Sequence, residues 1–455
     1  MHTSQTGSPD NQRSLGAGVF LAVELCLAFI CLVLFTEGLL PRLFADEYDT
    51  ESSAFLRMLW LPVYGLVIAG CLWKIRPLFA ATIRLPFLIG LLAITASSFL
   101  WSLDPALTER RSIAVVATSL AGLFLAARYD WRTLLRLLGA VWLFMALVSL
   151  GSILVSPGFA IMTEVHPGAW RGLWWEKNAM GGHMARAAFI CAFLFVLDKP
   201  WRPVWGTAVF LCCVLVVFST SKTALLGLLF GFGVLFAGWV SRRGAATTIS
   251  SLWIGIVLVA GFAAIMAINP ALIFNLLGRD ATLTGRTDIW SVLIDAIADR
   301  PLLGYGYGAF WQLESMPAYR VRAATEWLVP TAHNGWLETA LGVGLTGLGL
   351  LVLNFALLVL RAAWLSIDSW LGIFALGVAG QFLLFSLSES IALQQNAIVW
   401  VTYVAVAAKT ALSLQGAREP EPQYTAPERQ QPSPGGAQTG LFRRPGLVRV
   451  QQHRL

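Results

Sequence analysis

Charge is scarce in this chain of 455 residues. Aspartate, glutamate, lysine and arginine together make up 13% of the residues, whereas hydrophobic residues make up 57%. A soluble domain usually carries about 25% charged residues, so the charged fraction is about half the usual one. The mean hydropathy of +0.69 agrees with this balance. The composition excludes a soluble globular domain and indicates an integral membrane protein.

Cysteine is also rare, and every cysteine lies inside an apolar run: Cys26, Cys31, Cys71, Cys191, Cys212 and Cys213. None is placed for a disulfide or a zinc site in an exposed loop, so we expect these cysteines to act as small apolar residues. The net charge of +7 comes without any basic run interleaved with aromatic residues in a soluble region. We therefore expect no nucleic-acid partner.

Long apolar runs are abundant. A helix needs roughly 20 apolar residues to cross a hydrocarbon core about 30 Å thick. The sequence supplies twelve such runs, at approximately 18–36, 55–73, 85–101, 113–127, 137–155, 181–197, 203–218, 223–240, 250–268, 335–360, 365–386 and 393–413. We predict an all-α polytopic membrane protein with about 12 transmembrane helices. The first run has no small-x-small cleavage pattern, so we expect it to be retained rather than removed as a signal peptide.

Lysine and arginine occupy alternate loops between these runs. With the N-terminus in the cytoplasm, the inner loops carry Lys74, Arg76, Arg84, Arg128, Arg132, Arg136, Lys199, Arg202, Arg242, Arg243 and Arg361. This follows the positive-inside rule and places both termini in the cytoplasm. The predicted parts are a cytoplasmic segment 1–17, helices 1–9 in 18–268, a large outer loop 269–334, helices 10–12 in 335–413 and a disordered cytoplasmic tail 414–455.

Loops longer than about 12–15 residues are usually functional or disordered. The outer loop 269–334 is far longer than this. Its stretch RTDIWSVLIDAIADRP, residues 286–301, has apolar residues at helical spacing. The spacing predicts an amphipathic helix that ends at Pro301 and lies on the membrane surface or covers a cavity.

Four predicted helices begin at the outer face, and each is preceded by a polar motif: WWEKNAMGGH, STSK, TAHN and SES. Free backbone N–H groups at helix N-termini attract anions, phosphate above all. Cationic side chains lie at or near these starts: Arg171, Lys177 beside Asn178, Lys222 and Arg286. We expect these cations to bind a multiply charged anion such as a diphosphate. The alternative is that the polar residues only cap the helices and the cations meet lipid headgroups.

His333 is the strongest candidate for proton transfer among the histidines away from the chain ends. It lies at the end of the long loop, between Thr331 and Asn334, with Glu338 one turn further along. A helix start disfavours imidazolium, so this imidazole should remain able to accept a proton. His166 is expected at the surface and His183 packed in a helix. The alternative for His333 is an ordinary helix-cap residue.

Several motifs, in this order, resemble the bacterial O-antigen ligase and exopolysaccharide polymerase family. They are WSLDP with RRS (101–112), RGLWWEKNAMG (171–181), STSKTA (219–224), LTGRTDIW (283–290), LLGYGYGAFW (302–311) and AHNGWLE (332–338). The similarity covers roughly residues 90–400. Each motif alone is weak, and the specificity comes from their common order.

The resemblance implies a multi-span glycosyltransferase of the bacterial inner membrane, related to the GT-C class. Such enzymes take a glycan from undecaprenyl diphosphate on the periplasmic side and join it to an acceptor, without a metal, a nucleotide sugar or another cofactor. Carried onto this sequence, the family's histidine matches His333, and its arginines match Arg286 and, with a poorer match, Arg171. Asn178, Asn334 and Glu338 would support these residues. Partners would be the lipid-linked donor, a glycan or lipid A core acceptor, membrane lipids, and other polysaccharide assembly and export proteins.

Three further functions remain open from the sequence. A ligase would transfer the glycan to lipid A core rather than extend a polymer. A metal-dependent transferase would use the acidic first outer loop, where Glu47, Asp49 and Glu51 alternate. A transporter or flippase would place ionisable groups near the bilayer midplane, and Glu24 is the clearest acidic residue deep in a predicted span.

Overall fold

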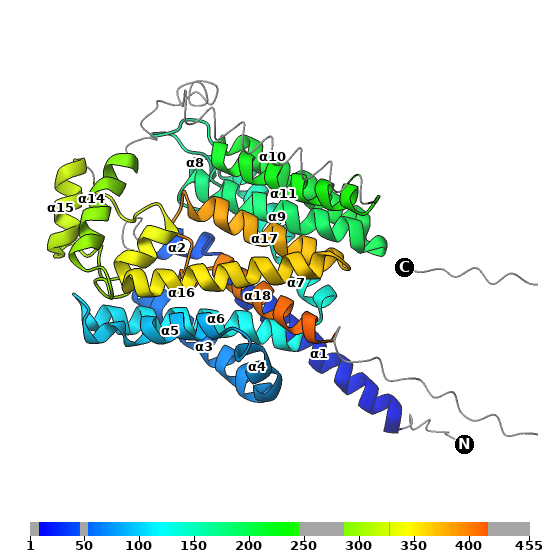
Figure 1. The fold of residues 1–455 in the computed structure, drawn as a ribbon. Coiled ribbons are helices and arrows are strands. Elements are labelled where there is room, and N and C mark those ends of the chain that lie inside the picture. The colour runs from blue at the N-terminus through cyan, green and yellow to red at the C-terminus, as the bar shows by residue number, and fades with distance from the viewer. Residues whose placement is uncertain (1–8, 46–52, 245–246, 248–285, 327, 417–455) are drawn as a thin grey trace, which may run out of the picture. The chain divides into compact units, whose positions relative to one another are not determined.

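The computed structural model describes residues 9–45, 53–244, 247, 286–326 and 328–416 (Figure 1). The regular elements of these residues are helices, and two residues, Ile161 and Trp170, form an isolated antiparallel bridge. The predicted all-α polytopic fold is confirmed.

Within the described residues, seven helices are long and apolar enough to cross a membrane, or eight if one bent pair counts as a span. The seven are α3 (Ala54–Trp73), α6 (Pro105–Arg128), α7 (Trp131–Val155), α9 (Lys177–Leu197), α10 (Arg202–Phe218) with its preceding turn η2 (Lys199–Trp201), α11 (Lys222–Ser241) and α16 (Gly335–Ser366). The bent pair is α4 (Ile75–Thr82) with α5 (Pro86–Ser97) and η1 (Ser98–Leu100), which meet at 97°. Shorter apolar stretches lie in α1 (Pro9–Leu34), α17 (Trp370–Ser386) and α18 (Ile398–Gly416).

Helices overlap eleven of the twelve predicted runs, whereas the ninth run, at 250–268, and the tail from 417 onward lie outside the described residues. The number of about 12 spans stays a prediction, because seven or eight helices of the described part reach the length and hydropathy of a span. Some boundaries differ. Helix α6 begins at Pro105 rather than near 113, because the Asp104 side chain accepts a hydrogen bond from the Leu107 N–H and Pro105 suits the first helical position. Hydropathy alone misses this polar first turn.

Small residues allow the central helices to approach each other closely. Helix α9 packs against α10, α11, α7 and α17, and α6 packs against α18. A Cβ at Gly377 would stand 2.1 Å from the Phe189 ring, and one at Gly227 would stand 2.4 Å from the Phe385 ring. Interfaces between membrane helices are typically built from such residues.

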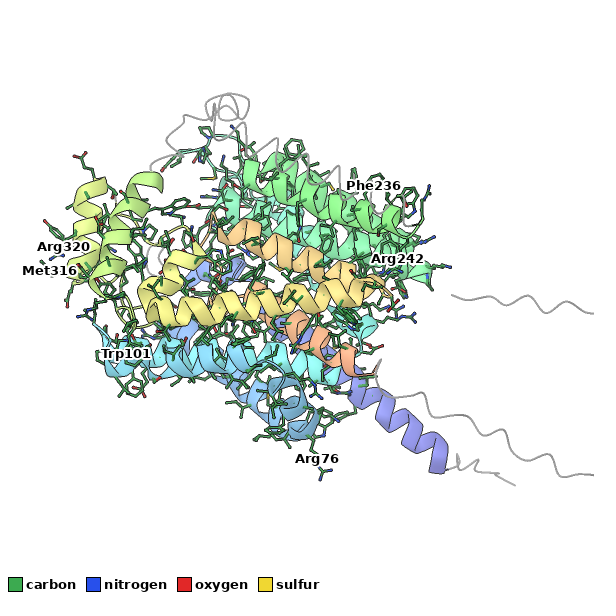
Figure 2. All side chains as sticks on the ribbon, in the orientation of Figure 1. Arg76, Trp101, Phe236, Arg242, Met316 and Arg320 are labelled. Carbon is green, nitrogen blue, oxygen red and sulfur yellow. The ribbon has the colours of Figure 1, made fainter. Side chains whose placement is uncertain are left out.

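The predicted amphipathic helix of the outer loop is confirmed as α14 (Arg286–Asp299). Its apolar residues face a second buried cluster formed with α15 (Met316–Thr325) and the start of α16. Leu293 and Ile289 are almost completely buried there. In Figure 2, Arg320 and Met316 of α15 lie at one end of the helices, and Arg242, just after α11, lies at the other.

Helix α16 is broken at Val343 and Gly344, where Gly344 has a φ of +69°. The break leaves backbone carbonyls without helical partners, and N–H groups of the GYGYG segment donate to them. Tyr305 N donates to Leu341 O at 2.8 Å and Gly306 N donates to Gly342 O at 3.0 Å. These bonds satisfy groups that would otherwise be buried without partners. The glycine motif therefore has a structural role at this break.

Candidate active site

The starts of α9 and α11 lie side by side. Lys177 Nζ, on the first residue of α9, donates to Thr220 Oγ1 at 3.2 Å, just before Lys222 begins α11. A Cβ at Gly181 would stand 2.7 Å from Ser219 Oγ, so the two helix ends are in close contact. The structure thus brings two of the predicted cations, with Asn178 in the same first turn of α9, to one place.

The electrostatic effect of Lys177 extends to the neighbouring loop. Partial burial and the nearby Lys177 charge lower the pKa of His166. His166 is exposed, as the sequence predicts. The Lys177 charge therefore acts on the loop before α9.

His333 is held in a fixed loop immediately before α16. The preceding residue, Ala332, is held by two hydrogen bonds. Trp290 Nε1 of α14 donates to Ala332 O at 3.0 Å, and Ala332 N donates to Glu338 Oε2 at 2.8 Å. His333 itself has a φ of +46°, and its N–H points to Thr331 Oγ1 at 3.4 Å. A non-glycine residue in this backbone region persists only where surrounding contacts hold it.

Asn334 is the N-cap of α16. Its Oδ1 accepts hydrogen bonds from Trp336 N at 3.0 Å and Leu337 N at 3.2 Å. Asparagine is among the best residues for this position. The cap fixes the direction in which the chain leaves His333.

Glu338 joins three segments through its carboxylate. Besides Ala332 N, it accepts hydrogen bonds from Trp311 Nε1 at 2.9 Å and from Ser390 Oγ at 3.2 Å. A buried carboxylate needs such donors to satisfy its oxygens. Glu338 therefore supports the His333 loop through the backbone.

Glu389 is a residue that the sequence reasoning missed. It belongs to the SES motif after α17, and its Oε2 lies 3.6 Å from His333 Nδ1. The motif was read only as the start of a helix. Nothing in the local sequence pairs it with a histidine on another helix, so no sequence signal could have assigned this contact.

Arg171 lies in the loop before α9, and its Nε donates to Phe159 O at 3.0 Å. Arg42 holds the same loop from another segment, because it donates to the carbonyls of Phe159, Gly172 and Trp174 at 2.7, 3.1 and 3.0 Å. Sequence reasoning gave Arg42 no role. Arg171 thus takes part in the structure of a loop that leads directly into the basic start of α9.

Arg286 is the first residue of α14, and its side chain lies outside the described residues. Its backbone position is four residues before Trp290, so both positions belong to the same face of the helix. Trp290 binds the peptide next to His333. Position 286 is therefore on the face of α14 that meets the His333 loop.

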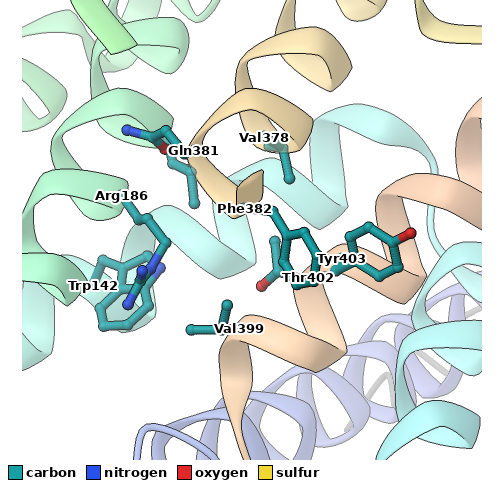
Figure 3. Close-up of a pocket in the computed structure, with 9 residues that line it drawn as sticks. Trp142, Arg186, Val378, Gln381, Phe382, Val399, Thr402 and Tyr403 are labelled. Carbon is teal, nitrogen blue, oxygen red and sulfur yellow. The ribbon is translucent and has the colours of Figure 1, made fainter. Parts of the chain in front are cut away.

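A buried arginine lies in α9, beyond the first turn of the helix. Arg186 of α9 extends over the Phe385 ring, 4.6 Å from its centroid, and its Nη2 lies 3.3 Å from His183 Nδ1. The His183 ring is itself packed between Trp142 and Trp174, at 5.3 and 5.1 Å, in agreement with its predicted packed role. Figure 3 shows the Arg186 side chain lining a cavity beside Trp142 and Gln381.

Two comparisons relate the chain to known proteins. A family model described as O-antigen ligase matches residues 207–352, a range that contains Lys222, Arg286, His333 and Glu338. The chain is also 27% identical over 321 residues to the exopolysaccharide production protein ExoQ of Rhizobium meliloti (strain 1021), covering 66% of this chain and 71% of that protein. The chain is thus similar to O-antigen ligases over residues 207–352 and to an exopolysaccharide production protein over a longer range. These similarities, together with the helices that are long and apolar enough to cross a membrane, support a multi-pass membrane protein of O-antigen ligase or polymerase type.

Proposed function

We propose that this protein polymerises undecaprenyl-diphosphate-linked repeat units into exopolysaccharide on the periplasmic side of the bacterial inner membrane. The observation that carries the proposal is the position of His333. It lies in a rigid loop beside a carboxylate, at the end of the molecule where the basic starts of α9 and α11 meet.

The chemistry follows from these groups. His333 takes the proton from an acceptor hydroxyl, whose oxygen attacks the anomeric carbon of the donor sugar. The bond from that carbon to the diphosphate oxygen breaks, and undecaprenyl diphosphate leaves with the electron pair. A single displacement inverts the anomeric configuration. A positioned base contributes about 10²- to 10⁴-fold to such a rate.

Stabilisation of the leaving diphosphate falls to the cations. Lys177 and Lys222 stand at adjoining helix starts, where backbone N–H groups add to their charge. Arg286 and Arg171 supply further positive charge from α14 and from the loop before α9. Because diphosphate leaves as a stable anion, these groups suffice without a metal ion, and loss of one such donor typically costs about 10²- to 10³-fold.

Two sequence segments and the name of the similar protein favour a polymerase over a ligase. The segment KN-x-x-G and the motif TGRTDIW are closer to polymerases, and the relative's name refers to exopolysaccharide production. The acceptor is then a second lipid-linked glycan. Transfer to lipid A core remains the alternative, and deletion of the gene separates the two: a polymerase mutant loses high-molecular-weight secreted polysaccharide, whereas a ligase mutant accumulates unliganded lipid A core.

Transport of the lipid-linked sugar is less well supported. Glu24 was the acidic residue on which that function rested, and its carboxylate is engaged by Arg128 through two hydrogen bonds of 2.7 and 2.8 Å. Such a bidentate pair is what stabilises a charge within a membrane span. The acidic residues proposed for a metal, Glu47, Asp49 and Glu51, lie outside the described residues.

The direct test is synthesis by the purified protein in lipid nanodiscs, with undecaprenyl-diphosphate-linked repeat units as the substrate. We expect longer glycans to form at the same rate with and without EDTA. Loss of product in EDTA, restored by Mg²⁺ or Mn²⁺, would support the metal-dependent alternative. Donor that crosses a vesicle membrane without forming a new glycosidic bond would support transport.

The side of the membrane is tested separately. A cysteine replacing Thr331 in a cysteine-free background should react with a membrane-impermeant maleimide added to the periplasmic face. Reaction only after the cytoplasmic face is opened would reverse the proposed orientation. A cysteine at Arg242, at the opposite end of the helices, is the matched control and should show the reverse pattern.

A further inference from the structure

We infer that Glu389 positions His333 for proton transfer by selecting one tautomer of its imidazole, an inference that rests on the proposed function. Glu389 Oε2 lies 3.6 Å from His333 Nδ1. This separation is that of an ion pair, and contacts of catalytic groups often tighten when substrate binds. An ionised carboxylate only accepts hydrogen bonds, so it requires the ring proton on Nδ1 and leaves Nε2 to receive the acceptor's proton.

The two side chains face each other because their segments are tied together. Trp336 Nε1 donates to Ser386 Oγ at 2.9 Å, and Ser390 Oγ donates to Glu338 Oε2 at 3.2 Å. A Cβ at Gly335 would stand 2.9 Å from the Ala392 Cβ, so only glycine allows this approach without a shift. Contacts at residues on both sides of Glu389 thus hold it against the His333 loop.

A cationic side chain lies close to Glu389. Arg186 and Glu389 attract each other electrostatically, and the Arg186 guanidinium lies over Phe385, one helical turn before Glu389. The side chain of Glu389 is 32% exposed and that of His333 is 18% exposed. Both ring nitrogens of His333 are buried, so the ring or its cover must shift for Nε2 to reach an acceptor hydroxyl.

A carboxylate in this place has two consequences for the reaction. It holds the imidazole plane in one orientation, which positions Nε2 for the acceptor hydroxyl. It also stabilises the imidazolium that forms once the proton has been taken. The carboxylate itself keeps no proton in this scheme, so Glu389 acts through His333 and does not contact substrate.

The test measures which ring nitrogen of His333 carries the proton. Protein isotope-labelled at both ring nitrogens of histidine is reconstituted in lipid, and the His333 signal is assigned by its loss in His333→Asn. At neutral pH we expect a protonated Nδ1 and an unprotonated Nε2. In Glu389→Gln the amide can also donate to Nδ1, so the proton should redistribute toward Nε2. Glu389→Asp keeps an ionised acceptor and should keep the wild-type tautomer, which separates the effect from misfolding.

Activity is measured on the same samples. We expect Glu389→Gln to reduce kcat by about 10- to 100-fold, less than the about 10²- to 10⁴-fold that the positioned base itself contributes, with a smaller change in the KM for donor. Glu164→Gln removes a carboxylate from the exposed loop before α9 and should leave both values unchanged.

The outcomes separate the two proposals. A protonated Nε2 in the wild type, or the same tautomer in Glu389→Gln, would overturn the role of Glu389 even if His333→Ala is inactive. The expected tautomer shift together with normal polymer from His333→Ala would support the Glu389 contact while refuting His333 as the base.

Discussion

Trp290 of α14 donates its indole N–H to the carbonyl oxygen of Ala332 at 3.0 Å. This bond connects the large outer loop to the peptide that immediately precedes His333. The Ala332 side chain is completely buried, so the bond forms at a place shielded from water. The helices of the outer loop therefore help to hold the His333 loop in place.

Trp290→Phe should reduce polymer formation with little effect on folding. Phenylalanine keeps most of the ring packing and removes the N–H, which typically contributes about 1 kcal/mol. A displacement of His333 by a fraction of an ångström would nevertheless slow proton transfer. Trp101→Phe is the control, because Trp101 donates the same kind of bond, to Leu303 O at 2.8 Å. Equal activity losses in the two variants would contradict a specific role for Trp290.

Lys222→Ala should weaken the use of the lipid diphosphate donor, whereas Lys222→Arg should retain most of it. Alanine removes the charge at the start of α11, and arginine keeps it. Initial rates over a range of donor concentrations would measure the effect. Lys199→Ala changes a lysine between α9 and α10, at the opposite ends of these helices, and should behave as the wild type. If donor use is unchanged in Lys222→Ala, this lysine has no part in diphosphate binding.

Arg286→Ala should impair donor use more than Arg286→Lys does. Lysine preserves the positive charge and loses only the bidentate geometry of the guanidinium. Removal of a charge-stabilising donor costs about 10²- to 10³-fold, and the lysine variant should recover part of this loss. Single-turnover measurements with purified protein give the rate of the chemical step. Similar rates for the two variants would show that charge at this position does not matter.

Gly344→Ala should destabilise the protein. Gly344 has a φ of +69°, and a Cβ there would stand 2.1 Å from Leu302 O, so the break in α16 would have to move. We expect a loss of at least about 1–3 kcal/mol from backbone strain alone. Gly349→Ala, further along the same helix with open space around the new Cβ, is the control and should be neutral or stabilising. Thermal unfolding in detergent would compare them, and equal Tm values would contradict the structural role of the break.

Much of the fold is predictable from the sequence because local apolar runs specify membrane helices. Runs such as 137–155 and 223–240 coincide with α7 and α11, since an apolar run of this length has few alternatives to a helix in a bilayer. The amphipathic helix at Arg286 follows from the same kind of local periodicity. The early start of α6 is missed because its first turn is polar and is set by the Asp104 cap.

The candidate site is only partly predictable. His333 and Asn334 stand out because a polar segment meets an apolar helix there, and Asn334 is indeed the cap. The contact of His333 with Glu389 depends on how α16 and α17 pack, and neither local spacing nor composition carries that information. The position of the GYGYG segment is explained by the break in α16, which depends on the tertiary structure.

The central claim is that His333 is the base for glycosyl transfer. The most direct measurement is the rate of polymer formation by purified His333→Ala in nanodiscs, compared with His166→Ala, which changes a histidine in the exposed loop before α9. We predict that His333→Ala is inserted and helical like the wild type but slower by about 10²- to 10⁴-fold, while His166→Ala retains its rate. Polymer formation at the wild-type rate by well-folded His333→Ala would contradict the account.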